Sequence, residues 1–213
     1  MGPEQNQPPS LASLLENLAA LQSGADQAFA SVVQRFPREV ACGGGCDDCC
    51  YAVFDLTPIE ALALALAWRR LPRQERREAL RRAEKAAAAF DRLSAQALAL
   101  PAQERIAAFS QARIACPLLS EGRCLAYAAR PLTCRLYGIP VATQGASHSC
   151  HRSHFKEGVS YPTVDFGKVQ AELGRLSQEA LALAPLLGPQ RRDLARALIW
   201  AQSQALTLDA LGA

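Results

Sequence analysis

The chain has 213 residues, half of them hydrophobic and about a fifth charged, which is the composition of a globular protein and not of a disordered one. A formal net charge of +3 is too small to indicate nucleic acid as a partner. The start of the chain has no signal-peptide pattern and the longest apolar run, residues 61–68, is far too short to span a bilayer, so we expect a cytoplasmic protein without a membrane partner.

The N-terminal part of the chain begins with a polar, proline-rich stretch. We expect residues 1–10 to form a disordered tail. Apolar residues then recur at helical spacing over residues 11–36. The pair Ser23–Gly24 predicts a break between two short helices, and the second of these should end before Pro37.

Two further stretches have the composition and spacing of helices. Strong helix formers fill residues 58–114, where two prolines mark breaks, and the pattern returns over about 165–206 with one break. Thr57 and Glu60 have the spacing of a capping box, which predicts a helix start between them. We therefore predict a mostly α fold in which residues 11–213 form a single helical domain.

Eight cysteines lie in two groups between these helical stretches. The first group is Cys42, Cys46, Cys49 and Cys50, and the second is Cys116, Cys124, Cys134 and Cys150. In a reducing compartment, thiols this crowded favour metal coordination over disulfides. Thiolate is the soft ligand that selects zinc, copper(I) or iron–sulfur clusters. We expect two irregular cysteine-bearing loops, residues 42–50 and 116–150, to converge on one metal centre or on two close ones.

The spacing of the cysteines leaves two metals open. Cys42, Cys46 and Cys49 have the C-x3-C-x2-C spacing that can hold three corners of a [4Fe–4S] cluster, with a distant cysteine as the fourth ligand. A four-cysteine zinc site usually has two C-x2-C pairs, and here only Cys46 and Cys49 form one. The spacing places an iron–sulfur cluster slightly ahead of zinc.

Charged residues flank the cysteines on both sides. Arg130 and Arg135 surround Cys134 and are expected to bind the cofactor by compensating the charge of metal-bound thiolates. Asp47 and Asp48 lie inside the first cysteine group. We interpret them as turn residues that face solvent.

The histidines and one basic stretch each have two interpretations. His148, His151 and His154 are the only histidines and lie beside Cys150, so they could complete a mixed site, although we favour a polar surface loop. Residues 69–92 are rich in arginine, but the acidic residues among them favour a solvated helix face over a nucleic-acid surface.

The motifs together resemble a known family. The run CGGGCDDCC, the segment CPLLSEGRCLAYAARPLTCRLYG and Cys150 are similar to the YkgJ-type cysteine-cluster family of zinc- or iron-chelating CxxCxxCC proteins. This chain departs from the pattern because three residues, not two, separate Cys42 from Cys46. The resemblance implies metal chelation through these cysteines. A more remote likeness to flagellin lysine methylases implies, as an alternative, an iron–sulfur enzyme or a redox or methyl-transfer protein, so the question of an enzyme stays open.

Overall fold

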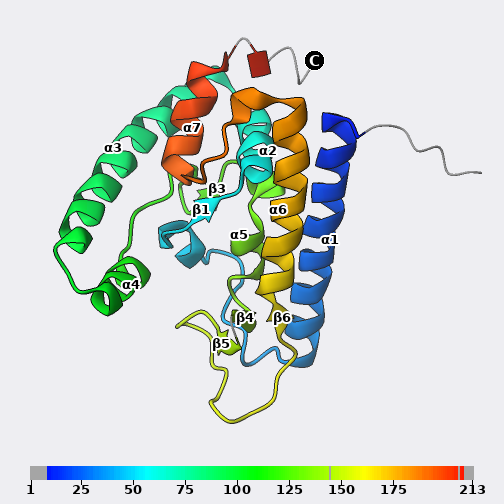
Figure 1. The fold of residues 1–213 in the computed structure, drawn as a ribbon. Helices are drawn as coiled ribbons and strands as arrows, with labels where there is room; N and C mark the ends of the chain where they lie inside the picture. The colour runs from blue at the N-terminus through cyan, green and yellow to red at the C-terminus, as the bar shows by residue number, and fades with distance from the viewer. Residues whose placement is uncertain (1–8, 144, 206, 209–213) are drawn as a thin grey trace, which may run out of the picture.

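The computed structural model describes residues 9–143, 145–205 and 207–208, and most of the expected tail lies outside the described residues. The predicted mostly α class is confirmed (Figure 1). The helices are α1 (Leu11–Arg35), α2 (Pro58–Arg69), α3 (Arg73–Leu98), α4 (Ala102–Gln111), α5 (Leu132–Leu136), α6 (Phe166–Leu183) and α7 (Leu194–Ser203). The 3₁₀ turns are η1 (Asp48–Tyr51), η2 (Tyr127–Ala129) and η3 (Pro185–Leu187).

The strands are short and form three small sheets. They are β1 (Asp55–Leu56), β2 (Leu119–Ser120), β3 (Arg123–Cys124), β4 (Val141–Thr143), β5 (Ala146–His148), β6 (Val164–Asp165) and β7 (Arg192–Asp193). β1 pairs with β7, β2 pairs with β3, and β4 lies between β5 and β6. Only the β4–β6 pair is parallel. None of the described helices has both the length and the apolar character needed to cross a membrane.

The predicted break in the first helix is wrong, because α1 continues through Ser23–Gly24. A glycine inside a helix costs about 1 kcal/mol relative to alanine, which does not by itself end a helix. Buried Leu14, Leu18 and Val32 anchor α1, which packs against α2, α5 and α6 and so offsets that cost. The predicted end before Pro37 is confirmed, and Ser10 belongs to the helix start because its Oγ accepts a capping hydrogen bond.

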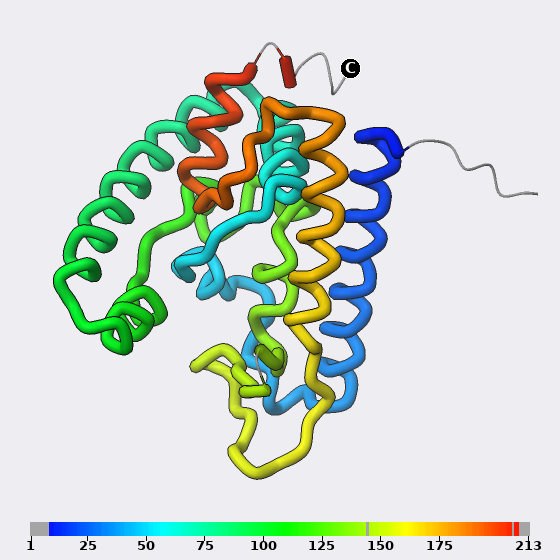
Figure 2. The backbone as a smooth tube through the Cα atoms, viewed as in Figure 1, coloured from blue at the N-terminus to red at the C-terminus, as the bar shows by residue number. Residues whose placement is uncertain are grey.

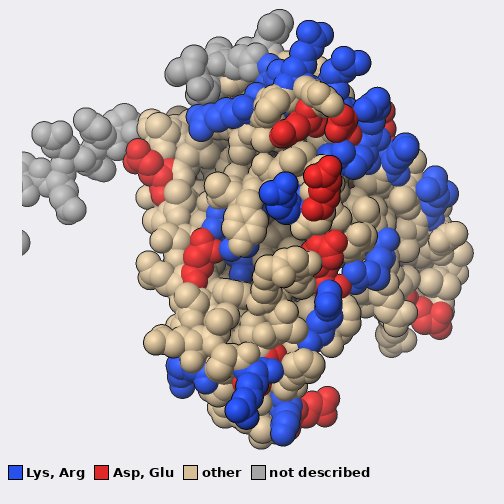
Figure 3. All heavy atoms as spheres, turned by 180° about the vertical axis from the view of Figure 1, so that it is seen from behind, with Lys and Arg blue, Asp and Glu red and all other residues tan. Residues whose placement is uncertain are grey.

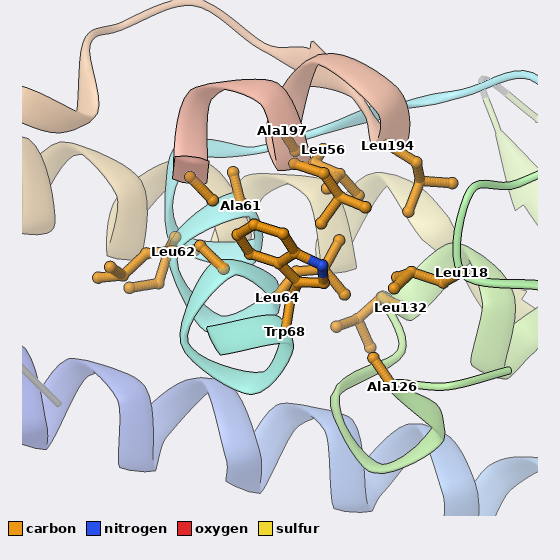
Figure 4. Close-up of a cluster of buried hydrophobic side chains, with 14 of the residues drawn as sticks. Leu56, Ala61, Leu62, Leu64, Trp68, Leu118, Ala126, Leu132, Leu194 and Ala197 are labelled. Atoms are coloured by element: carbon orange, nitrogen blue, oxygen red, sulfur yellow. The ribbon is translucent and has the colours of Figure 1, made fainter. Parts of the chain in front are cut away.

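Helix α2 lies at the centre of the hydrophobic core. Its predicted start is confirmed, since the Thr57 backbone N–H donates to Glu60 Oε2 at 3.1 Å. Trp68 is 1% exposed, and Figure 4 shows its indole beside Leu64, Leu118 and Leu132. Two of these leucines come from the second cysteine segment, so that segment contributes to the same core as the long helices.

The second cysteine segment is more ordered than its sequence indicates. Residues 116–150, which we predict as an irregular cysteine-bearing loop, contain two hairpins and the short helix α5. Leu118, Leu132, Leu136 and Ile139 are all at most 1% exposed. Their burial is not visible in the sequence pattern because these residues follow no single helical or strand period.

The two cysteine segments meet between two groups of helices. In Figure 2, the chain around residues 48–56 runs between the α3–α4 pair on one side and the α1–α6 pair on the other. Cys116 N–H donates to the Cys50 carbonyl at 2.6 Å, and Ile114 N–H donates to the Tyr51 carbonyl at 3.2 Å. These backbone bonds fix the first cysteine loop directly against the second segment.

Candidate metal centre

One cavity collects most of the sequence-predicted ligands. It has a volume of about 730 Å³. Seven of the eight cysteines line it, namely Cys42, Cys46, Cys49, Cys50, Cys116, Cys124 and Cys134. Cys150, the eighth, is buried elsewhere, next to Asp48. The two loops therefore bring seven thiols from distant parts of the sequence to one place.

Four of these thiols form a connected chain in the order Cys134, Cys49, Cys50, Cys116. Hydrogen bonds from Cys134 and Cys50 lower the pKa of Cys49 to about 3. Contact with Cys50, whose one S–H proton can be donated to either neighbour, also lowers the pKa of Cys116 below its ordinary value. As donors, Cys50 and Cys134 have raised pKa values, chiefly because of these same hydrogen bonds. The shifts therefore alternate in direction along the chain, lowered at Cys49 and Cys116 and raised at Cys50 and Cys134.

Backbone amides point at two of the cavity sulfurs. The amides of Leu118 and Leu119 hydrogen-bond to Cys116, and the amide of Ala126 hydrogen-bonds to Cys124. Such bonds stabilise a thiolate, and bonds of this kind also tune metal-bound cysteines. Despite its amide, Cys124 has a pKa of about 11, because burial outweighs the hydrogen bond.

The N-terminus of α5 positions Cys134. Glu60 is only 4% exposed, and its carboxylate accepts hydrogen bonds from Thr57 and, at 3.1 Å, from the backbone N–H of Leu132. The capping box of α2 therefore also ties down the first residue of α5. Since Cys134 lies two residues further along, this buried carboxylate fixes the helix that presents the thiol.

Cys42 lies against the backbone of Gly138. A Cβ at residue 138 would lie 2.3 Å from Cys42 Sγ, so only glycine permits this approach. The glycine run before Cys46 forms a turn in which Gly45 has a φ of +86° and Cys46 N–H donates to the Gly43 carbonyl at 3.1 Å. Burial, followed by the charge of Cys46, raises the pKa of Cys42 to about 12.

Arg130 and Arg135 line the cavity but share a carboxylate partner that the sequence did not indicate. Arg130 Nη2 donates to Asp26 Oδ1 at 3.1 Å, and Arg135 also pairs with Asp26. The charge of Arg130 still acts on the thiols, because it lowers the pKa of Cys49 and opposes the rise at Cys124. A role of both arginines in cofactor binding stays a prediction. Asp26 is an ordinary helix position in sequence, and no local pattern could have identified it.

Asp48 does not face solvent, and its interpretation as an exposed turn residue was wrong. It is 3% exposed, and Arg113 Nη2 donates to its Oδ1 at 2.8 Å. Burial would raise the pKa of Asp48, but the hydrogen bonds from Arg113 and Cys150 outweigh it and lower that pKa. Asp47 is half-buried and lines the cavity of seven cysteines.

The histidines divide into two kinds. His148 and His154 have exposed side chains, as expected for a polar surface loop. His151 is also exposed, but its Nδ1 lies 3.6 Å from Asp48 Oδ2. The sequence grouped the three histidines by proximity to Cys150, whereas the fold distinguishes them by their distance to Asp48.

The arginine-rich helix α3 contributes to the cysteine segment at one point. Arg82 Nε donates to the carbonyl of Pro117 at 2.8 Å and so supports the turn that begins at Cys116. On the face shown in Figure 3, acidic side chains are interspersed among the basic ones. This mixture agrees with the interpretation of a solvated surface.

A protein-family model matches residues 41–151, a segment that contains all eight cysteines and spans just over half of the chain. The family is CxxCxxCC, described as a "putative zinc- or iron-chelating domain". The chain belongs to the CxxCxxCC family. The suspected resemblance is thereby confirmed, and the seven cysteines of the cavity lie within the matched CxxCxxCC segment. No curated protein and no solved structure matches the chain.

The donor set of this CxxCxxCC protein fits a soft or borderline metal. Sulfur ligands select zinc and iron–sulfur clusters over hard ions such as magnesium or calcium. The cavity provides seven sulfurs, and backbone amides point at two of them. Three helices lie wholly outside the matched segment and flank the CxxCxxCC domain, namely Leu11–Arg35, Phe166–Leu183 and Leu194–Ser203.

Proposed function

We propose that this protein chelates iron as a polynuclear iron–sulfur cluster in the cavity of seven cysteines. The observation that carries the proposal is the arrangement of the thiols: seven of them surround about 730 Å³. A single zinc ion draws four sulfurs to about 2.3 Å from one point. A cluster spaces its ligands more widely, because each thiolate binds a different iron. Seven thiols are more than one zinc ion binds, and this number favours a polynuclear cluster. The sulfurs of the hydrogen-bonded row from Cys134 to Cys116 must move apart when each binds its own iron.

Cys49, Cys50, Cys116 and Cys134 are proposed as the centre of the ligand set. They form the continuous chain of thiols and come from both cysteine loops. The pKa values of Cys49 and Cys116 are lowered and those of Cys50 and Cys134 are raised, and each thiol that binds metal must do so as a thiolate. When bound, a cluster would supply one-electron redox chemistry or a structural cross-link.

Arg130 is proposed to offset the net negative charge of the metal-bound thiolates. Its guanidinium lies near enough to act on Cys49 and Cys124, and Asp26 holds it in place through the 3.1 Å hydrogen bond. Arg135 is buried and also pairs with Asp26, and its Nε donates to the backbone carbonyl of Arg130 at 2.9 Å. The alternative of an iron–sulfur enzyme related to flagellin lysine methylases gains no support from the comparisons.

The test is anaerobic purification from medium replete in iron and zinc, followed by metal analysis, sulfide analysis and an absorption spectrum. We expect iron and acid-labile sulfide in equal molar amounts, with broad visible absorption. Cys134→Ser should lose most of this iron, whereas Thr133→Ala, a neighbour on the same helix, should keep it. If the purified protein contains zinc and no acid-labile sulfide, the cluster proposal is wrong and the cavity is a zinc site. A metal-free protein with eight titratable thiols would refute chelation altogether.

A further inference from the structure

Three potential ligands meet outside the cavity of seven cysteines. Asp48 lies in η1, and Cys150 and His151 follow β5, a hundred residues later in the sequence. One ligand atom from each lies within 4.8 Å of the other two. Cys150 does not line the cavity of seven cysteines, but its charge acts on Cys42, so this group adjoins the cavity.

The distances within the group match those around a tetrahedral ion. Asp48 Oδ2 lies 3.5 Å from Cys150 Sγ and 3.6 Å from His151 Nδ1. With zinc bonds of about 2.3 Å to sulfur and about 2.0 Å to oxygen and nitrogen, tetrahedral angles place O and S about 3.5 Å apart and O and N about 3.3 Å apart. Both separations from Asp48 Oδ2 are therefore within a few tenths of an ångström of the tetrahedral values, and Cys150 Sγ and His151 Nδ1 lie within 4.8 Å of each other.

The surroundings of the group hold two of its members in place. Asp48 is 3% exposed and Cys150 is 7% exposed. Arg113 occupies Asp48 Oδ1 and leaves Oδ2 directed at Cys150 and His151. The backbone N–H of Arg152 lies 3.5 Å from Cys150 Sγ, where it would stabilise a bound thiolate.

We propose that Asp48, Cys150 and His151 form a second metal site, next to the cysteine centre, which binds one zinc-class divalent ion. One sulfur, one nitrogen and one oxygen ligand suit a borderline ion such as zinc, which all three donor types bind. Three protein ligands leave a fourth coordination position for water or a small ligand. Asp48 and His151 also line a second cavity of about 830 Å³, which gives such a ligand room.

The test counts zinc bound by metal-free, reduced full-length protein under anaerobic conditions. His151→Ala is the decisive variant because this side chain is 66% exposed, so its removal should not disturb folding. His148→Ala is the matched control, since it removes an exposed imidazole from the same segment. We expect His151→Ala to bind one equivalent of zinc fewer than wild type, and His148→Ala to bind as much as wild type.

Cobalt(II) provides a second readout in the same variants. A tetrahedral site with one sulfur ligand should contribute visible d–d absorption and a thiolate charge-transfer band, so the spectrum of wild type minus that of His151→Ala should show both. The difference in bound zinc and in the cobalt spectrum between wild type and His151→Ala should persist when both proteins carry Cys134→Ser, because that substitution affects the cysteine centre. Equal zinc stoichiometry and equal cobalt spectra for wild type and His151→Ala would overturn the second site. Unchanged iron content in His151→Ala would show that the cluster in the cysteine cavity does not need His151, so the two proposals are tested separately.

Discussion

The two sides of helix α5 belong to different regions: one side is part of the apolar core, and the other lines the cavity of seven cysteines. Leu132 and Leu136 are four residues apart and both are buried in the core beside α2. Cys134 lies between them and lines the cavity. Because residues two apart point to different sides of a helix, one short helix serves both regions. The thiol is therefore mounted on a packed core and does not depend on metal alone for its position.

The largest expected effect comes from breaking the core side of α5. Leu132→Ala should lower the free energy of unfolding of the metal-free protein by about 2–5 kcal/mol, because it leaves a cavity beside Trp68. Cys134→Ala, on the other side, should change it far less while removing metal. Denaturant unfolding measures the free energy of unfolding of both variants, and metal analysis measures the metal loss. The exposed Ile106→Ala is a control whose free energy of unfolding should stay within about 0.5 kcal/mol of wild type. Equal losses for Leu132→Ala and Cys134→Ala would show that the two sides are not distinct.

The helices were predictable because their signals are local. The capping box of Thr57 and Glu60 and the apolar periodicity identify α2 from neighbouring residues alone. The cysteine positions are likewise visible in the sequence. The break at Ser23–Gly24 was misjudged because the packing that holds α1 together comes from α5 and α6, which lie far away in the chain.

The arrangement within the site was not predictable because it depends on contacts between distant segments. Asp26 meets Arg130 and Arg135 across more than a hundred residues of sequence. Asp48 is buried only because Arg113 and the turn at Cys150 fold over it. A single sequence carries no periodic or local signal for either contact.

Glu60 tests the connection between the two regions. Glu60→Gln should lower the free energy of unfolding by about 1.5–3 kcal/mol, because the buried carboxylate accepts charge-assisted hydrogen bonds from Thr57 and Leu132. Metal content should fall as well, since α5 loses the anchor of its first residue. Glu104→Gln, an exposed position on α4, is the control that should change neither quantity. A stable Glu60→Gln variant without metal would place the role of Glu60 in the site alone.

Gly138 tests the cavity side directly. Gly138→Ala would drive a methyl group to 2.3 Å from Cys42 Sγ, so Cys42 must move, at a cost of about 1–3 kcal/mol of unfolding free energy. Gly24→Ala is the matched control: nothing lies within 4 Å of its new Cβ, and it should stabilise α1 by about 0.5–1 kcal/mol. Comparing metal content with that of Cys42→Ser shows whether Cys42 is a ligand. If both Gly138→Ala and Cys42→Ser retain full metal, Cys42 only packs beside the centre.

The smallest expected effect is a pH dependence of the free energy of unfolding of the metal-free protein, caused by the buried thiol of Cys124. Burial raises the pKa of Cys124 to about 11, above its ordinary value near 9, so folding favours the neutral thiol. The stabilising contribution is therefore fully present below about pH 8.5, where the unfolded thiol is still protonated, and is lost as the pH rises through 11. Between about pH 8 and about pH 10 we expect the free energy of unfolding to fall by about 1 kcal/mol beyond the fall seen in Cys124→Ser, because serine does not ionise there. Denaturant unfolding at pH 8, 9.5 and 11 of both proteins measures the difference. Parallel curves would mean that Cys124 ionises as readily in the folded cavity as in water, and its burial would then be only apparent.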